Sequence, residues 1–341
     1  MTNWSIPEDW LRIETIDAHT AGEPFRVVLS GLPEPEGRTL LERRRYARTH
    51  LDHLRRALMW EPRGHADMYG CLLVPPDSPQ ADLGVLFMHN EGYSTMCGHG
   101  IIGLTTVAIE AGLIEADGEQ HELAIETPAG LVRATAALEA GRVRSVRFRS
   151  VPSFVVELDQ LIEVPGFGRL HYDLAFGGAF YAFLDASQIG LPLTAEATAG
   201  WIEAGRAVKQ AVNAKRRVEH PFEPDLGFLY GAIFVGPAVD PACHSRNVCI
   251  FAEGEVDRCP TGTGVSARLA IHHARGELDP GQWIEVESLI GTRFRGQVVE
   301  ETRFGPYPAV VPEVEGSAYV TGRHTFVIDP ADPLKEGFLL R

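Results

Sequence analysis

The chain has 341 residues, of which 45% are hydrophobic and 23% charged, a composition ordinary for a soluble globular protein. At roughly 100–200 residues per domain, this length predicts two domains, each large enough to form its own hydrophobic core. The formal net charge of −15 argues against nucleic acid or an anionic membrane surface as a partner.

The beginning of the chain, MTNWSIPEDWLRIE, is acidic and mixed, and it lacks the basic start and apolar stretch of a secretory signal. No apolar run approaches the roughly 18 residues that a membrane helix needs. The cysteines are few and irregularly spaced, which favours free thiols in a reducing compartment. We therefore expect a cytoplasmic protein. The five cysteines are Cys71, Cys97, Cys243, Cys249 and Cys259.

The pattern of apolar residues predicts a mixed α and β chain. In chain order, the first part is predicted to contain strands at 11–17 and 25–30, a charged helix at 38–58, a buried strand at 84–89, an apolar helix at 98–113 and short strands to about residue 186. The second part is predicted to contain an amphipathic helix at about 194–218, strands at 230–236 and 247–252, a helix at about 262–275, and strands at 282–288, 294–300, 308–313 and 318–328.

A short glycine-rich segment occurs twice. CGHGIIG at residues 97–103 aligns with TGTGVSA at 261–267, and at the same offset Gly112 aligns with Gly276. Because the glycines match at three places and the flanking elements also agree, we interpret the chain as a duplicated α/β unit rather than as two coincidentally similar turns. The halves are expected at residues 1–170, joined by the C-terminal segment of about 322–341, and at residues 171–321.

The helix after Cys97 is apolar nearly all round, so we expect it to be buried, with its N-terminus opening inside the protein. The helix after Thr261 is similar but more polar. A helix N-terminus presents unpaired N–H groups and a partial positive charge, and glycines allow a ligand to approach the backbone closely. Two such turns facing each other predict an enclosed site for a carboxylate. The residues expected to hold it are Gly98, His99, Gly262 and Thr263.

Cys97 occupies the first of these turns. A free thiol has a pKa of about 8.5, and a helix N-terminus lowers it, so the position predicts a thiolate at neutral pH that can act as a base. A lone cysteine is more often a small core residue, but the MCGHG setting favours a functional role. His99 could pair with the thiolate, contact a substrate or simply fill space.

Asp257 precedes the second turn. Its carboxylate could hold the cationic amine of a substrate, or it could cap a helix or pair with Arg258. The spacing of the cysteines and histidines does not match a closed tetrahedral metal site, and neither CxxC nor HExxH occurs. We also find no Walker loop and no GxGxxG in a βαβ setting. The sequence therefore predicts neither a metal nor a nucleotide cofactor.

The sequence resembles the proline racemase superfamily over most of its length. The resemblance is carried by DAHTAGEP at 17–24, EPRGHADMYG at 61–70, HNEGYSTMCGH at 89–99 and DRCPTGTG at 257–264. It implies an α/β (α+β) fold like that of diaminopimelate epimerase. In that fold two pseudo-symmetric domains each wrap a sheet around a central helix, and the active site lies between them. It also implies a small cyclic imino acid as the substrate and no cofactor.

Racemases and 4-hydroxyproline epimerases of this superfamily use two opposed cysteines, one as base and one as acid. The first matches Cys97, and the second falls at Thr261, whose hydroxyl is far too weak an acid and base for that role. Threonine at this position marks the trans-3-hydroxy-L-proline dehydratases. The resemblance therefore implies a hydro-lyase in which Cys97 removes the α-proton, Asp257 binds the ring nitrogen, and His99 or Cys97 protonates the leaving hydroxide.

Three alternatives stay open. A 4-hydroxyproline 2-epimerase or proline racemase would need a second thiol. Cys259 stands where serine is usual in the motif and could supply one, although a shift of two residues across Pro260 should displace the side chain too far for catalysis. A binding protein for a cyclic imino acid and a thiol-dependent hydrolase are the others. The sequence does not distinguish a monomer from a homodimer.

Overall fold

The computed structural model describes residues 4–340, so the outermost residues of the predicted halves, 1–3 and 341, lie outside the described part. Its first elements are β1 (Leu11–Thr20), β2 (Glu23–Ser30), α1 (Leu40–His50), α2 (Asp52–Met59), β3 (Tyr69–Val74), β4 (Leu83–His89), α3 (Gly98–Glu110), β5 (Gln120–Thr127), β6 (Gly130–Glu139) and β7 (Arg142–Arg149). The following elements are β8 (Ser153–Val164), β9 (Gly168–Phe176), β10 (Phe180–Asp185), α4 (Thr198–Lys215), β11 (Leu229–Gly236), β12 (Ser245–Phe251), β13 (Glu255–Val256), α5 (Gly262–Ala274), β14 (Ile284–Glu287), β15 (Arg293–Phe304), β16 (Tyr307–Gly316) and β17 (Ala318–Ile328).

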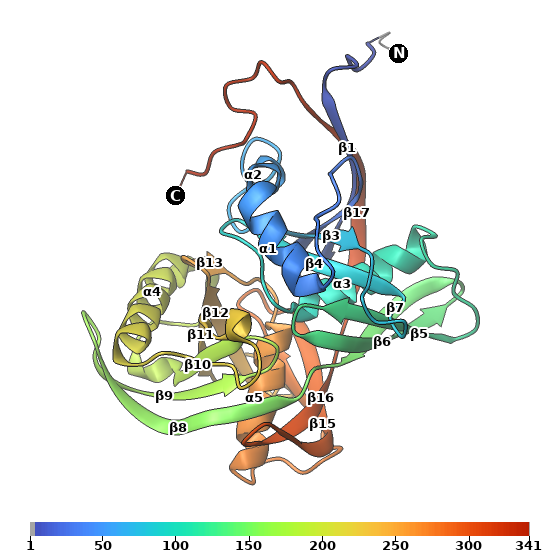
Figure 1. Ribbon diagram of the computed structural model, residues 1–341. Coiled ribbons are helices and arrows are strands. Elements are labelled where there is room, and N and C mark those ends of the chain that lie inside the picture. Colours follow the sequence, from blue (N-terminus) through green and yellow to red (C-terminus); the bar gives the residue numbers. More distant parts are fainter. Residues whose placement is uncertain (1–3, 341) are drawn as a thin grey trace.

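Two buried helices form the centres of the fold. Helix α3 packs against β1, β2, β6, β7, β16 and β17, whereas α5 packs against β8, β9, β10, β15 and β16 (Figure 1). Both helices are buried from the first residue through most of their length. Each is followed by a glycine with positive φ, Gly112 at 70° and Gly276 at 68°, a conformation that glycine adopts without strain. The predicted fold, with a sheet wrapped around a central helix in each half, is confirmed.

The strands form one continuous hydrogen-bonded sheet that links the two halves. Strand β17 pairs with β1 along its whole length, from Thr20 opposite Ala318 to Leu11 opposite Ile328. Strand β16 pairs with β7 on one side and with β15 on the other. The packing of β8 and β9 against α5 favours a boundary between the halves nearer residue 150 than the predicted residue 170. The exact division stays a prediction.

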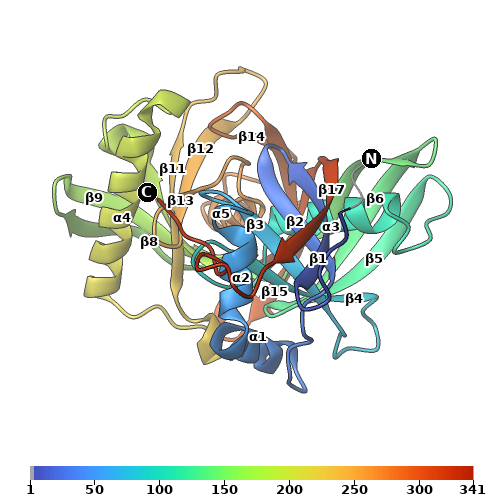
Figure 2. The same cartoon turned by 90° about the horizontal axis from the view of Figure 1, so that it is seen from above.

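The remaining helices cover the outside of the sheet. Helix α4 packs on β11 and β12, and α1 and α2 pack on β4 (Figure 2). The predicted helix at 38–58 is in fact two helices. Leu51, at φ −113° and ψ 6°, ends α1 and begins α2, so the axis changes direction there. Strand β3 was not predicted, because its six residues directly follow a polar, glycine-containing turn.

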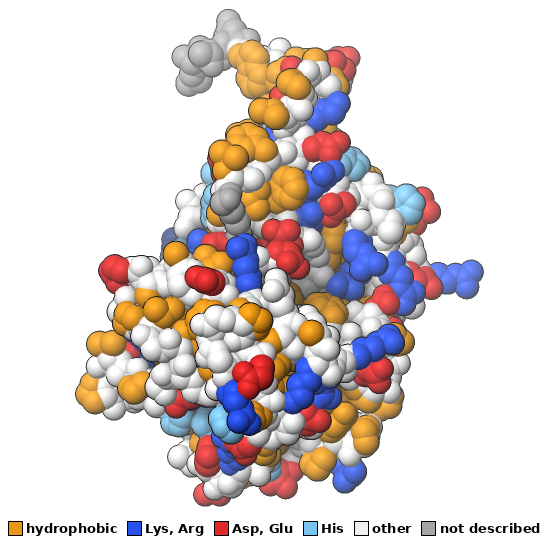
Figure 3. Space-filling view, turned by 90° about the vertical axis from the view of Figure 1, so that its left-hand side faces the viewer, with side chains coloured by type: hydrophobic (Ala, Val, Ile, Leu, Met, Phe, Trp, Pro, Cys, Tyr) orange, Lys and Arg blue, Asp and Glu red, His pale blue; other side chains and the backbone are white. Residues whose placement is uncertain are grey.

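Several global predictions can be compared with the structure. All five cysteines are free, as expected, and all five are buried. Within residues 4–340, no helix is both long and apolar enough to cross a membrane. Acidic and basic side chains are interspersed over the face drawn in Figure 3.

Candidate active site

The N-termini of α3 and α5 meet at two glycines. A Cβ atom added to Gly98 would lie 2.6 Å from the Cα of Gly262, and one added to Gly262 would lie 2.8 Å from the Cα of Gly98. Only residues without a side chain allow the two backbones to approach so closely. Cys97 and Thr261 are the N-cap residues of the two helices. The two first turns therefore face each other, as the repeat predicted.

A small pocket of about 290 Å³ lies at this junction and is lined by residues from both halves. The structure brings all the predicted site residues to this one pocket. They are Cys97, Gly98, His99, Asp257, Thr261, Gly262 and Thr263. Three tyrosines that sequence reasoning did not select also line it, Tyr69, Tyr181 and Tyr230.

The Cys97 sulfur is held by short polar contacts. It accepts a hydrogen bond from the Gly100 N–H at 3.2 Å and lies 3.2 Å from Nδ1 of His99. Burial raises the pKa of the Cys97 thiol well above its usual value, and this effect outweighs the hydrogen bond from Gly100 and the influence of the nearby Tyr69 side chain, which both lower it. The predicted thiolate at neutral pH is therefore wrong for the protein alone. One helix N-terminus does not compensate for the removal of the sulfur from water.

This protonation state can be measured. The measurement is the difference in ultraviolet absorbance between wild type and Cys97→Ala. We expect this difference to show no thiolate until the pH rises well above about 8.5, the ordinary cysteine pKa. The reason is the burial of Cys97, which is 4% exposed. Circular dichroism at each pH serves as the control for unfolding. A thiolate signal already complete at neutral pH would contradict this expectation.

His99 is buried beside the sulfur. Burial lowers the pKa of His99 to about 3, so the ring is neutral at physiological pH and cannot act as a cationic partner for a thiolate. Its backbone carbonyl accepts a hydrogen bond from the Thr20 hydroxyl at 2.9 Å, and its ring packs edge-on against Tyr69 with the centroids 4.6 Å apart. His99 thus contacts the Cys97 sulfur and lines the pocket, and its contact with a substrate stays a prediction.

Asp257 forms part of a buried acidic group. Its Oδ1 accepts the Cys259 N–H at 2.8 Å, and burial raises the pKa of its carboxyl. Burial and the nearby Asp257 charge also raise the pKa of Glu23, which accepts the Arg258 N–H at 2.7 Å. The Arg258 guanidinium contacts Asp67 at 2.9 Å. Asp257 also lines the pocket, so its carboxyl lies within reach of a ligand bound there, and the pairing of this group with an amine stays a prediction.

Thr261 has an unusual backbone. Its φ of 66° and ψ of 89° lie in the left-handed region, which β-branched residues rarely adopt. Such strain is retained at functional sites when the surrounding structure enforces it. The buried hydroxyl oxygen forms no well-aligned hydrogen bond among the described residues, although it lies close enough to the Cys249 thiol to lower the pKa of that group.

Two further thiols lie near Thr261. Cys249 lines the pocket from β12, and sequence reasoning missed it. The signal was available, because alternation along a strand places Asn247, Cys249 and Phe251 on one face. Cys259 accepts the Thr261 N–H at 3.3 Å. Burial raises the pKa of both thiols well above the usual value.

His99, Asp257 and Cys259 bring their potential metal-ligand atoms within 4.8 Å of one another. Two of them already take part in hydrogen bonds of the turn, since Asp257 accepts from Cys259 and the Cys259 sulfur accepts from Thr261. The absence of a metal therefore stays a prediction, based on these contacts and on the lack of a recognised ligand spacing.

Comparison with known proteins decides the family. The profile described as "Proline racemase" matches residues 15–339. The chain belongs to the proline racemase family. Among relatives in this family, it is 48% identical over 338 residues to the trans-L-3-hydroxyproline dehydratase of Xenopus tropicalis, covering 98% of this chain and 97% of the relative. It is 45% identical over 329 residues to the 3-hydroxyproline 2-epimerase of Burkholderia multivorans, covering 96% and 98%.

A solved structure supports the same assignment. The fold of this proline racemase family member matches that of a hydroxyproline epimerase from Agrobacterium vitis with bound trans-4-hydroxy-L-proline. The TM-score is 0.93 at 34% identity, and the match covers 98% of this chain and 96% of the other.

Proposed function

We propose that the chain is a trans-3-hydroxy-L-proline dehydratase, a hydro-lyase that works without a cofactor and forms Δ1-pyrroline-2-carboxylate. The observation that carries the proposal is the asymmetry of the two helix N-termini. One bears the Cys97 thiol, and the other bears Thr261, whose hydroxyl cannot act as the second acid or base at neutral pH. The names of relatives such as the Xenopus tropicalis dehydratase support the same reaction.

The pocket offers complementary groups for a cyclic amino acid. The backbone N–H groups at the starts of α3 and α5, supplied by Gly98, His99, Gly262 and Thr263, bind the carboxylate. Asp257 binds the ring nitrogen. These N–H groups also stabilise the negative charge that develops on the carboxylate when the α-proton is removed.

Substrate binding also accounts for the activation of Cys97. The negative charge of Asp257 is one of the causes that raise the pKa of the Cys97 thiol. A cationic amine paired with Asp257 offsets that charge, and it adds a positive charge close to the sulfur. The helix N–H groups neutralise the substrate carboxylate, so the amine decides the effect: the pKa of Cys97 falls when the substrate is bound, and the thiolate forms where the α-proton is to be removed.

The stereochemistry of the substrate requires only one catalytic face. In trans-3-hydroxy-L-proline the hydroxyl is trans to the carboxylate and so lies on the same ring face as the α-hydrogen. Cys97 removes the α-proton, the electron pair forms the C2–C3 double bond, and hydroxide leaves from C3. The Δ2-pyrroline-2-carboxylate that results tautomerises to the Δ1 form. No base is needed on the Thr261 face.

A single assay tests the proposal. The protein is incubated in deuterated water with trans-3-hydroxy-L-proline, trans-4-hydroxy-L-proline or L-proline, and the products are followed by NMR. We expect water loss from the first substrate and no inversion of the other two. Inversion at a comparable rate would instead identify an epimerase or racemase. Binding of pyrrole-2-carboxylate without turnover of any substrate would identify a binding protein.

The epimerase alternative is favoured by one observation, the presence of the buried thiols of Cys249 and Cys259 close to Thr261. The Burkholderia multivorans relative is named an epimerase as well. If wild type inverts trans-4-hydroxy-L-proline, the variants Cys249→Ser and Cys259→Ser will identify the thiol that acts as the second acid.

Thr261→Cys should convert part of the dehydratase activity into epimerase activity. The variant places a thiol at the N-terminus of α5 opposite Cys97, so a proton can be delivered to the second ring face. We expect inversion of trans-4-hydroxy-L-proline to rise from undetectable to measurable in the NMR assay. Thr261→Ser is the matched control, and it should show no inversion. Equal inversion by both variants would mean that residue 261 does not supply the acid.

We further infer that the protein is cytoplasmic, since its five thiols are free, and that it is a monomer or a homodimer. Size-exclusion chromatography with light scattering will distinguish the two assemblies. Fractionation of the source cells tests the location.

A further inference from the structure

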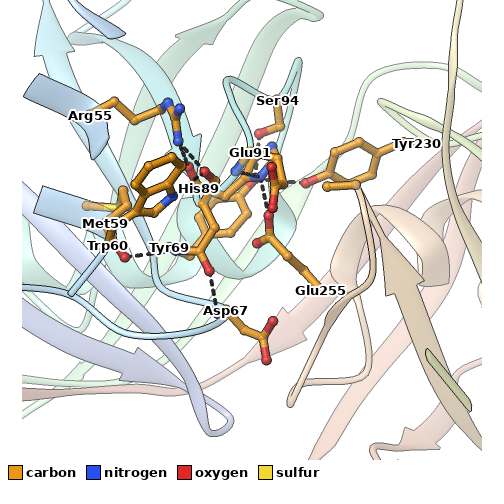
Figure 4. Close-up of polar contacts among 12 residues, drawn as sticks. Arg55, Met59, Trp60, Asp67, Tyr69, His89, Glu91, Ser94, Tyr230 and Glu255 are labelled. Carbon is orange, nitrogen blue, oxygen red and sulfur yellow. Dashed lines mark hydrogen bonds and ion pairs between the residues drawn. The ribbon is translucent and has the colours of Figure 1, made fainter. Parts of the chain in front are cut away.

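A buried arginine in the second half of the chain has no carboxylate partner. Arg268 lies on α5 and is 7% exposed, and no aspartate or glutamate within residues 4–340 forms an ion pair with it. Arg55 is also buried, but it contacts the Asp52 carboxylate at 2.7 Å and donates to the backbone carbonyl of His89 at 2.7 Å (Figure 4). Because burial of a charged side chain is unfavourable unless a counter-charge compensates it, Arg268 is suited to bind an anion.

The contacts of Arg268 hold its guanidinium in place without neutralising it. Its Nε donates to Nε2 of His272 at 3.1 Å, one terminal nitrogen donates to Oγ of Ser245 at 2.7 Å, and the other lies 3.4 Å from Nδ1 of His244. Burial lowers the pKa of His272, and it lowers the pKa of His244 to about 4, so both rings are neutral at neutral pH. Burial lowers the pKa of Arg268 only to about 10, so the guanidinium remains a cation.

Part of this guanidinium remains available to a ligand. A guanidinium has five N–H groups, and the contacts to His272, Ser245 and His244 use three of them. The nearby Glu277 carboxylate contacts Nδ1 of His272 at 2.7 Å. Among the described residues, two N–H groups of Arg268 therefore stay free to bind a carboxylate.

Arg268 lines a cavity of about 530 Å³ in the second half of the chain. Within the described part of the chain, no residue that lines this cavity also lines the catalytic pocket. Asp173 and Arg275 line it as well, but they pair with each other at 2.9 Å, and Asp185 is exposed to solvent. The cavity therefore combines one uncompensated cation with an apolar surface. The apolar walls are formed by Phe183, Leu184, Val235 and Ile271.

We propose that the cavity around Arg268 is a second ligand site, which binds a small monocarboxylate with an apolar body. The carboxylate accepts hydrogen bonds from the free N–H groups of Arg268, and the apolar walls cover the hydrocarbon part. The carboxylates of Asp173 and Asp185 disfavour a ligand with more than one negative charge. This site is independent of the proposed dehydratase function, so either inference can fail without the other.

Isothermal titration calorimetry with 4-methylpentanoate tests the site. This probe combines one carboxylate with a branched apolar body, and 4-methylpentanamide has nearly the same shape without the charge. We expect wild type to bind the amide about 10–100-fold more weakly than the acid, because hydrogen bonds between charged partners are stronger than those to a neutral group. No binding of the acid, or equal binding of both compounds, would overturn the proposal.

Two variants assign the binding to this cavity. Arg268→Met removes the cation, and Val235→Phe fills the space while it keeps the arginine and its contacts. Each should weaken the binding of 4-methylpentanoate at least about tenfold. Arg55→Met is the matched control, since it removes a buried arginine outside the cavity and should keep the wild-type affinity.

Circular dichroism shows whether each variant is folded. If Arg268→Met does not fold, Val235→Phe alone decides, because it leaves the hydrogen bonds of the arginine in place. Wild-type affinity in folded Val235→Phe would mean that the acid binds elsewhere, for example in the catalytic pocket, and would overturn the proposal. An equal loss of affinity in Arg55→Met would do the same, because a general effect of removing a buried arginine would then be the cause.

Discussion

Cys97→Ala is expected to abolish α-proton exchange and dehydration together, with a loss of at least about 10⁴-fold. The sulfur is the group in the pocket positioned to remove the α-proton, and the neutral His99 cannot replace it because its pKa of about 3 makes it too weak a base. Exchange and product formation are measured in one NMR time course. The binding of pyrrole-2-carboxylate, measured by calorimetry, shows whether the pocket remains intact.

The matched control is Cys71→Ala. Cys71 is also a free, fully buried cysteine, but it lies outside the pocket on β3, so its removal should reduce stability slightly and leave catalysis unchanged. Dehydration by Cys97→Ala at the wild-type rate would refute the assignment of the base. So would an equal loss of activity in the Cys71 and Cys97 variants, because a general effect on the core would then be the cause.

Gly98→Ala should damage both stability and activity. The added methyl group would lie 2.6 Å from the Cα of Gly262 and 3.0 Å from the Phe148 ring, so the two helix N-termini must move apart. Overpacking of this kind costs about 1–3 kcal/mol in the free energy of unfolding. A displacement of about 1 Å at the carboxylate site should lower kcat/KM by about 10²-fold. Urea denaturation and steady-state kinetics measure the two effects.

Gly92→Ala is the control for this substitution. A Cβ atom at Gly92 meets no heavy atom within 4 Å, so the variant should match wild type in both measurements. If Gly98→Ala retained full activity and wild-type stability, the close approach of α3 and α5 would not be needed for the site. The proposed clamping of a carboxylate by both helices would then be incorrect.

Much of the site could be predicted because it depends on local sequence. The repeated glycine-rich turns at 97–103 and 261–267 predicted two buried helices with facing N-termini, since the requirement for glycine and the apolar helix surface are both visible in the sequence. The contribution of Asp257 followed from the family resemblance. The structure brings these residues to one pocket, as expected.

The missed features depend on contacts between distant segments. The pKa of Cys97 is dominated by burial, which results from the closing of both halves around the sulfur and not from the residues beside it in the chain. Tyr69 was overlooked because β3 was not predicted. The two helices α1 and α2 were predicted as one because the break at Leu51 contains neither glycine nor proline.

The pairing of β17 with β1 has a consequence for biosynthesis. Residues 318–328 form one of the strands packed on α3, although they are made more than two hundred residues after that helix. The apolar surface of α3 therefore stays incompletely covered on the ribosome until translation is nearly finished. Contacts between such distant segments slow folding and prolong the exposure of apolar surface. The nascent chain therefore has a long interval in which chaperones can bind it.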